Sequence, residues 1–296
     1  MCVISENAVQ RHLLYSVVIP TCNRANVLEQ LLRRLAPQVD ANGEIIVTDD
    51  SPSQKEAKEV VSKFANVCVV PGPRGGRAAN RNFGAGSAKG DWIIFVDDDV
   101  VPDGRFIQAY LESIADGRAD VLEGRTYSDP NLDLARFGAP INETGGLLWS
   151  CNFAIRRSLF EAVGGFAEVF TTPGCEDVEF QARLLRAGHF IQFVESASVY
   201  HPPRLRDTLF QTAKRWQATW VLRLLWNERP LGLFVRLPRH IIAYGIGDAL
   251  QFKSPRARAI LIFRAVFAAG IVACWLPWWH LRHFRRIEAF RKTRSG

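Results

Sequence analysis

Three consecutive carboxylates, Asp97, Asp98 and Asp99, directly follow the apolar run Trp92–Val96. An apolar run of this length without polar alternation predicts a strand buried on both faces of a parallel sheet. The carboxylates would then lie at the carboxyl end of that strand, where open α/β sheets bind their ligands. Because adjacent carboxylates repel one another, a hard cation such as Mg²⁺ or Mn²⁺ would stabilise them and attract phosphate groups. The alternative is a solvated acidic turn that binds nothing.

The chain before this run alternates predicted strands and helices. Leucine spacing, apolar runs and Gly or Pro breaks predict strands over residues 15–20, 44–48, 67–70 and 92–96, and helices over 25–35, 53–64 and 77–88. This order is typical of a right-handed parallel α/β sheet. Less regular patterns predict a helix over 106–115, strands over 120–124 and 145–155, helices over 158–163 and 178–187, and one or two strands over 190–200.

Polar side chains follow three of the first four strands, so a parallel sheet would bring them to one edge. They are Thr21, Asn23, Arg24, Asp49, Asp50 and the acidic trio. Arg74, Arg77 and Arg81 precede the acidic strand, near the Gly-rich turn 71–76. Cations beside carboxylates suit a nucleoside diphosphate and its metal. Arg77 alone could be a surface charge, and the glycines match neither a P-loop nor a dinucleotide-binding fingerprint.

Five short motifs in a fixed order resemble the family 2 glycosyltransferases, inverting enzymes of the GT-A fold. They are residues 17–24, 49–51, 81–84, 97–99, and Gly164-Gly165-Phe166 followed by Glu176-Asp177. The resemblance spans residues 15–201 and implies a Rossmann-like, mostly parallel sheet with flanking helices. Two departures are Ser51-Pro52, where Gly-Ser is commoner, and an acidic trio that leaves the metal ligand open.

The resemblance implies a role for each matching residue. Donor binding would fall to Pro20, Thr21, Asn23, Arg24, Asp50, Arg77, Arg81, Asp97 and Asp98. Asp99 would ligate Mg²⁺ or Mn²⁺, and His201 would join it unless that histidine is structural. Asp177 would be the catalytic base with Glu176 beside it, although acids at a helix start are also favoured by the helix dipole. Trp149 and Asn152 are candidates to support the acceptor, although an aromatic residue there could equally belong to the core.

Glycosyl transfer explains why these residue types would be needed together. Displacing a nucleoside diphosphate from an anomeric carbon builds negative charge on the leaving phosphate, which a divalent cation stabilises. The attacking hydroxyl must lose its proton as it bonds, and a positioned carboxylate can accept that proton. A single displacement inverts the anomeric carbon and requires only one such base.

The charge of the chain is divided between its two parts. Of 296 residues 48% are hydrophobic, which is ample for a core, and the formal net charge is +7. Residues 204–296 hold 18 of the 37 Lys and Arg residues but only 4 of the 30 Asp and Glu residues. Such asymmetry indicates a basic region that meets an anionic surface. Six scattered cysteines without a CxxC pair and an N-terminus without a signal-like apolar core favour a reducing compartment.

The basic region combines apolar helical faces with arginines. Residues 208–228 carry apolar and aromatic side chains at helical spacing, and residues 245–247 predict a break. Residues 259–279 are apolar apart from Arg264 and Pro277. Tryptophans at one end of that run and arginines beyond it favour an interfacial or re-entrant segment on anionic lipid. A single membrane span and a soluble helix packed on the catalytic domain are the alternatives. The pattern does not suit nucleic acid, because large apolar faces interrupt the basic residues.

These observations lead to one hypothesis about function. We expect an N-terminal tail over 1–14, a glycosyltransferase domain over 15–203 and a membrane-associating helical region over 204–296. The enzyme would transfer a sugar from a nucleotide donor, favoured to be a UDP-sugar, to a lipid-linked or polysaccharide acceptor at the cytoplasmic face of a membrane. The rival hypothesis is a non-catalytic nucleotide-sugar-binding scaffold. A nucleotidyltransferase would need a glycine-rich basic signature at the first strand end, which the sequence lacks.

Overall fold

The computed structural model describes residues 14–131, 137–170, 174–205, 208–226, 230–250 and 255–293. These residues fall into two compact units. The first contains Met1–Pro130, Ala139–Glu168 and Asp177–Pro203, and the second contains Asn131–Gly138, Val169–Glu176 and Arg204–Gly296.

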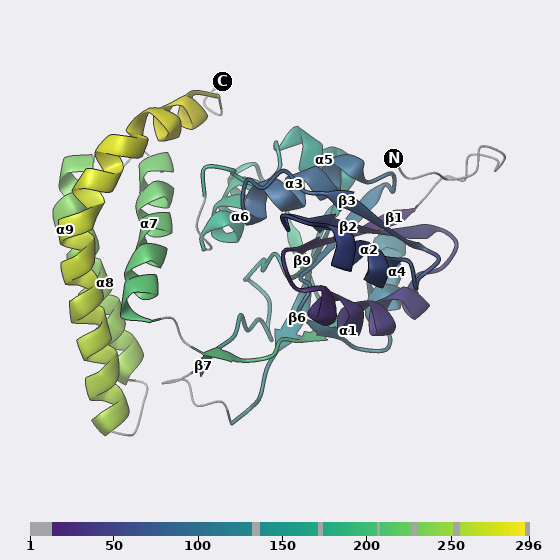
Figure 1. Ribbon diagram of the computed structural model, residues 1–296, viewed down its shortest axis with the longest axis horizontal. Helices are drawn as coiled ribbons and strands as arrows, with labels where there is room; N and C mark the ends of the chain where they lie inside the picture. The colour runs from purple at the N-terminus through teal and green to yellow at the C-terminus, as the bar shows by residue number, and fades with distance from the viewer. Residues whose placement is uncertain are drawn as a thin grey trace. The chain divides into compact units, whose positions relative to one another are not determined.

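The first unit is built on an eight-stranded sheet with the order β3-β2-β1-β4-β8-β6-β9-β5 (Figure 1). The strands are β1 (Tyr15–Thr21), β2 (Gly43–Asp49), β3 (Val67–Pro71), β4 (Trp92–Val96), β5 (Val101–Pro102), β6 (Val121–Tyr127), β8 (Asn152–Arg156) and β9 (Ile191–Tyr200). Strands β3, β2, β1 and β4 are parallel, as the sequence predicts. Strand β8 runs antiparallel to both β4 and β6, and β6 pairs with β9 in parallel.

Helices cover both faces of this sheet because its central strands are apolar on both faces. Alternate residues of one strand enter different cores: Ile94 and Val96 join one core cluster, and Ile93 and Phe95 join the other. Helices α1 (Ala25–Leu35), α2 (Lys55–Val61) and α4 (Phe106–Asp116) pack in the first core, and α3 (Arg77–Ser87), α5 (Arg157–Ala162) and α6 (Glu176–Arg186) in the second. A 3₁₀ turn, η1 (Ala36–Gln38), follows α1.

The second unit is mainly helical. Helices α7 (Leu209–Leu225), α8 (Pro230–Leu250) and α9 (Pro255–Thr293) pack together, and β7 (Phe137–Gly138) pairs with β10 (Arg204–Leu205) in a two-stranded sheet. A Thr208 capping box starts α7, in which the threonine hydroxyl accepts from Gln211 N and the Gln211 side chain accepts from Thr208 N.

Two expectations for the helical region are wrong. Helix α8 runs through residues 245–247 without a break. A side chain at Gly245 would collide with Ala265 of α9, so this glycine allows two helices to approach closely rather than ending one. Helix α9 also continues past Pro277, so it has no re-entrant turn there.

A third correction concerns the glycine-led stretch before β8. Residues 145–151 do not form a strand, since Gly145 and Gly146 have φ angles of 85° and 94°. The buried Glu123 carboxylate accepts a hydrogen bond from Gly146 N at 2.6 Å, and Asn142 Oδ1 accepts from Gly145 N at 3.0 Å. The stretch is therefore a fixed turn of backbone that leads into β8.

The aromatic cluster behind β4 generates a stability prediction. The ring of Phe95 lies 4.8 Å from Phe153, 5.3 Å from Phe160 and 5.5 Å from Phe166, measured between centroids. Phe95→Ala should lower the free energy of unfolding by about 3–5 kcal/mol, because it leaves a cavity in the core. Phe190→Ala is the control: Phe190 is 66% exposed and should change stability by no more than about 0.5 kcal/mol. Equal losses in denaturant unfolding would contradict this packing.

Candidate active site

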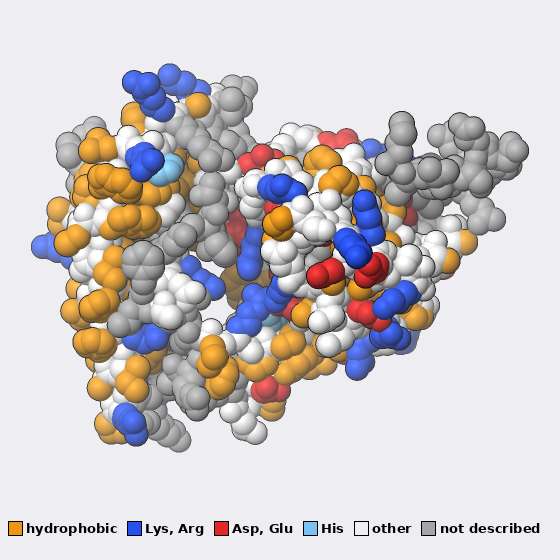
Figure 2. Space-filling model, in the orientation of Figure 1, with side chains coloured by type: hydrophobic (Ala, Val, Ile, Leu, Met, Phe, Trp, Pro, Cys, Tyr) orange, Lys and Arg blue, Asp and Glu red, His pale blue; other side chains and the backbone are white. Residues whose placement is uncertain are grey.

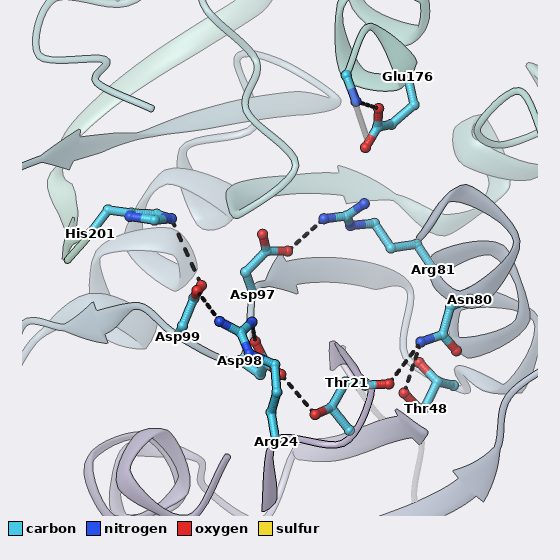
Figure 3. Close-up of polar contacts among 11 residues, drawn as sticks. Thr21, Arg24, Thr48, Asn80, Arg81, Asp97, Asp98, Asp99, Glu176 and His201 are labelled. Atoms are coloured by element: carbon cyan, nitrogen blue, oxygen red, sulfur yellow. Dashed lines mark hydrogen bonds and ion pairs between the residues drawn. The ribbon is translucent and has the colours of Figure 1, made fainter. Parts of the chain in front are cut away.

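The acidic trio lies where the sequence predicts, at the carboxyl end of β4, and its three side chains point to different partners (Figure 3). Asp97 pairs with Arg81, Asp98 with Thr21 and Arg24, and Asp99 with Arg24 and His201. Two guanidinium groups therefore compensate three adjacent carboxylates within the protein itself.

Asp97 is held by a buried arginine. Arg81 Nη2 donates to Asp97 Oδ1 at 2.6 Å, and the Arg81 side chain is only 2% exposed. Burial alone would raise the pKa of Asp97, but the charges of Arg81 and Arg77 and the hydrogen bond from Arg81 outweigh it, so the pKa is lowered. Asp97 is thus kept as a carboxylate. Arg77 is exposed at the start of α3, yet it contributes to this field.

The pKa of Asp98 is shifted in the opposite direction to that of Asp97. Thr21 Oγ1 donates to Asp98 Oδ2 at 2.7 Å, and Arg24 Nη1 donates to Oδ1 at 2.5 Å. Burial nevertheless raises the pKa of Asp98 to about 6, and the charges of Asp99 and Asp97 act in the same direction. Neighbouring carboxylates of the trio therefore differ in how readily they bind a proton.

Asp99 and His201 form a pair suited to a divalent cation. Asp99 Oδ1 lies 3.8 Å from His201 Nε2, and His201 Nδ1 lies 2.9 Å from the carbonyl oxygen of Pro202. Because a carbonyl only accepts, Nδ1 carries a proton. In the neutral form of the ring, Nε2 would therefore have its lone pair on the side of Asp99. Oxygen and nitrogen donors that face one another in this way can share a cation. Among the described residues no group of three or more His, Cys, Asp and Glu side chains could hold a metal, so substrate and water would supply its other ligands.

The ends of β1 and β2 form the side of the site expected to hold the nucleotide. A pocket there is lined by Thr21, Asn23, Arg24, Ala25, Asp49, Ser51, Pro52, Ser53, Glu56 and Ala57. Asp50 lies beside this pocket, and Arg74 N donates to Asp50 Oδ1 at 2.9 Å. Burial raises the pKa of Asp50, while hydrogen bonds from the backbone of Arg74 and Gly76 oppose that rise. Pro20, the remaining candidate on this side, is a half-buried residue of β1.

Two residues that the sequence analysis did not assign organise this pocket. Asn80 Nδ2 donates to the carbonyl oxygens of Thr21 at 3.3 Å and Thr48 at 3.0 Å, so it joins the ends of β1 and β2. A side chain at Gly72 would collide with the carboxylate of Asp50 and the amide oxygen of Asn80. The signal in the sequence that could have indicated Asn80 was an amide side chain one residue before Arg81, on the same predicted helix.

The candidate base lies in the first turn of α6. Asp177 Oδ1 accepts a hydrogen bond from Val178 N at 3.0 Å. Burial raises the pKa of the Cys151 thiol, and the charges of both Asp97 and Asp177 add to that rise. Cys151 therefore lies within electrostatic reach of the acidic trio and of Asp177. Glu176 is 5% exposed, and its Oε2 accepts from Gly174 N at 2.8 Å.

The two acceptor candidates have structural partners. Asn152 is 1% exposed; its Oδ1 accepts from the Tyr110 hydroxyl at 2.6 Å, and its Nδ2 donates to the carbonyl oxygens of Arg125 and Ala197. Its amide thus joins α4, β6 and β9, and this burial gives it a structural role rather than contact with an acceptor. The Trp149 ring packs partly against the first core, and its Nε1 donates to Ile141 O at 3.0 Å.

The raised pKa of Asp98 generates a pH prediction. Between its ordinary pKa of 3.8 and about 6 the folded protein binds a proton that the unfolded chain releases, so this group's contribution to stability falls as pH rises through that range. Asp98→Asn does not titrate. In EDTA, its free energy of unfolding should therefore increase relative to wild type between about pH 4 and pH 7, by up to about 3 kcal/mol. Asp116→Asn, at the exposed last residue of α4, should run parallel to wild type. A difference that stays constant or falls for Asp98→Asn would contradict the assignment.

Comparisons with known proteins place this geometry in a family. The family model described as glycosyl transferase family 2 matches residues 16–164, and a second, the N-terminal domain of galactosyltransferase, matches residues 141–204. Chondroitin synthase from Escherichia coli is 30% identical over 64% of this chain and 35% of its own length. Pre-mycofactocin glycosyltransferase from Mycobacterium tuberculosis is 30% identical over 67% of this chain and 45% of its own length. The chain thus spans roughly a third to a half of these two relatives.

Solved structures share the fold at low sequence identity. The mannosyltransferase PcManGT from Pyrobaculum calidifontis, in complex with GDP-Man and Mn²⁺, has a TM-score of 0.60 at 17% identity, covering 90% of this chain and 88% of its own. TarS 1–349 from S. aureus, in complex with UDP-GlcNAc, has a TM-score of 0.57 at 18% identity, covering 96% and 91%. The sheet and helices of the first unit therefore form a GT-A fold. Because the family model matches half of its residues, the chain belongs to the family 2 glycosyltransferases.

Proposed function

We propose that this glycosyltransferase moves a sugar from a nucleoside diphosphate donor, a UDP-sugar in the first instance, to a hydroxyl of a lipid-linked or polysaccharide acceptor, with inversion. The observation that carries the proposal is the acidic trio at the carboxyl end of β4, which Arg24 and Arg81 compensate beside the pocket at the ends of β1 and β2. Asp177, in the first turn of α6, is the separate acid. A site with one group of acids for the diphosphate end and one separate acid can serve a single displacement.

The donor would lie across the carboxyl ends of β1, β2 and β4. Its base would enter the pocket beside Asp50, whose carboxylate is oriented by the backbone amide of Arg74. Its diphosphate would approach Arg24, Arg77 and Arg81, since guanidinium groups bind phosphates through paired N–H donors. The two solved structures contain GDP-Man and UDP-GlcNAc. For this chain, a UDP-sugar is the donor to test first.

Asp177 would act as the general base. It would accept the proton of the acceptor hydroxyl while the oxygen bonds to the anomeric carbon and the bond to the diphosphate breaks. Asp97 and the arginines would hold the donor so that the face opposite the leaving group turns toward Asp177. Asp97 is unsuited to the base role because its lowered pKa and its bond to Arg81 make it a weak proton acceptor.

Mg²⁺ or Mn²⁺ would be held by Asp99 and His201. When bound, such an ion stabilises negative charge on a leaving diphosphate. In the neutral ring, the contact between His201 Nδ1 and Pro202 O would leave the Nε2 lone pair on the side of Asp99, so both metal-binding atoms would be oriented in advance. Arg24, which contacts Asp98 and Asp99 and is 39% exposed, would keep the trio compensated between turnovers.

The acceptor and location rest on the second unit. Residues 258–285 of α9 form a helix long and apolar enough to cross a membrane by length and composition. The basic residues concentrated in 204–296 would favour an anionic leaflet, as at the cytoplasmic face. An enzyme held there would meet lipid-linked or growing polysaccharide acceptors, and one relative is a chondroitin synthase.

The base assignment predicts the effect of Asp177→Asn. Turnover should fall by about 10²–10⁴ because the amide cannot accept the proton, while the affinity for UDP should stay within a few-fold of wild type. UDP release would be followed with UDP-glucose, UDP-galactose and UDP-N-acetylglucosamine, using a membrane lipid extract as the acceptor source, and UDP affinity by calorimetry. Asp116→Asn is the matched control. Near-normal turnover in Asp177→Asn would refute the role.

The metal assignment predicts a loss of activity in EDTA that Mn²⁺ or Mg²⁺ restores. His201→Ala and Asp99→Asn should need at least a roughly 10- to 100-fold higher Mn²⁺ concentration for half-maximal activity, which is the loss caused even by removing a partner that only orients a metal ligand. Titration of free Mn²⁺ by electron paramagnetic resonance, with UDP present, measures the same affinity without turnover. His189→Ala, in the turn between α6 and β9, should bind Mn²⁺ as wild type does. Unchanged Mn²⁺ affinity in both variants would exclude this site.

A further inference from the structure

One face of α9 exposes large apolar side chains along most of its length. Ile260, Phe263, Phe267, Trp278 and Leu281 are 44%, 61%, 45%, 56% and 80% exposed. Their spacing of three, four, eleven and three residues keeps them on one side of a helix. We call these five residues the apolar stripe. Exposed apolar surface of this extent on a soluble protein marks an interaction site.

The opposite face of α9 packs within the helical unit. Leu261, Ala265, Ala268, Val272 and Leu276 are buried at the complementary positions of the helix. Helix α9 contacts both α7 and α8, so its buried face is already occupied and its outer face is not.

Polar residues within the apolar run turn inward rather than outward. Arg264 Nη2 donates to Thr212 Oγ1 of α7 at 3.2 Å. Trp220 Nε1, also on α7, donates to His280 Nδ1 at 3.3 Å, and His280 is 7% exposed. No exposed residue between Arg258 and Arg282 in this described helix is charged. Helix α9 is therefore apolar on its outer face as well as on its buried face, whereas a water-soluble bundle turns polar side chains outward.

Arginines border the apolar stripe at both ends. Arg256 and Arg258 precede it, Arg282 and Arg285 follow it, and all four are exposed. The Arg282 guanidinium lies 5.3 Å from the centre of the Trp278 ring. Figure 2 shows apolar side chains gathered along α9, with Lys and Arg side chains toward its ends. Tryptophan and arginine at the rim of an apolar surface suit the headgroup region of a bilayer with anionic lipid.

A surface position explains these features better than a span. Helix α8, which packs against α9, exposes Arg236 and Arg239. Crossing the bilayer would carry such residues toward the hydrocarbon core at a cost of about 2.5–3.5 kcal/mol each. A helix that lies in the membrane plane immerses only one face and leaves its partner helices in water or among headgroups.

We infer that α9 lies along the surface of an anionic membrane, with the apolar stripe immersed and Arg256, Arg258, Arg282 and Arg285 at lipid phosphates. This inference rests on the proposed membrane location and is independent of the catalytic assignment. It commits to a bilayer as the partner because the charge at the rim is positive throughout, which disfavours a second copy of the same face.

The test compares vesicle binding of the full-length wild type with that of Phe263→Ser/Phe267→Ser. The double variant should bind phosphatidylcholine vesicles containing phosphatidylglycerol roughly tenfold more weakly or worse, since it withdraws two aromatic side chains from lipid. Arg282→Gln/Arg285→Gln should lose most of the preference for phosphatidylglycerol over pure phosphatidylcholine. Phe190→Ser, which removes an equally exposed ring from the first unit, is the matched control and should bind as wild type does. Thermal unfolding verifies that each variant is folded.

Three outcomes would overturn the inference. The first is vesicle binding unchanged by the double variant, and the second is wild-type protein that stays in the membrane after alkaline carbonate extraction, which would indicate a span. The third is a wild-type protein that binds no vesicles but forms a dimer, if the double variant no longer forms that dimer. UDP release from donor hydrolysis in solution, measured on the same variants, reports separately on the catalytic proposal. The rate of UDP release should be the same in these variants as in wild type. A protein that binds vesicles but releases no UDP would count against the catalytic assignment alone.

Discussion

The structure depends on compensating three adjacent carboxylates at the end of one buried strand. Arg81 reaches Asp97 from α3, and Arg24, the N-cap of α1, reaches both Asp98 and Asp99. Without these cations the carboxylates would have to be solvated or protonated, and a buried strand end permits neither cheaply. Each cation comes from a helix that follows a different strand, so the charge arrangement requires the first half of the sheet to be assembled. Binding of an anionic, metal-loaded donor fits the same requirement, because it brings a further cation to an acidic site.

The first four strands and their helices were predictable because each residue pattern had one interpretation. Fully apolar strands alternate with amphipathic helices, and the α1 prediction matches Ala25–Leu35 at both ends. Beyond residue 102 the pattern fails where tertiary contacts decide the structure. Residues 145–151 are apolar enough for a strand, but Glu123 and Asn142 hold their glycines in a turn. Gly245 resembles a helix break, yet it serves a close contact between helices that the sequence does not reveal.

The site was predictable where it follows strand ends, and less so where partners come from distant segments. The motifs indicated Asp97, Asp98, Asp99, Arg24 and Arg81, but not which cation contacts which acid. The contact between Asp99 and His201 joins residues that follow β4 and β9 and lie far apart in the chain. Asn80 and Gly72 were not predicted as site residues, because an asparagine in a helix and a glycine in a loop have many structural explanations. Asn152 was a candidate to support the acceptor, and the structure instead gives its amide one hydroxyl and two carbonyl partners within the fold.

The most direct test of this account is anomalous scattering from Mn²⁺ in crystals grown with UDP. The account predicts a peak that contacts Asp99 and His201, with the nucleotide in the pocket beside Asp50. A peak elsewhere in the protein, or an occupied nucleotide pocket in which Arg24 alone still neutralises Asp99, would contradict the central role given to this strand end.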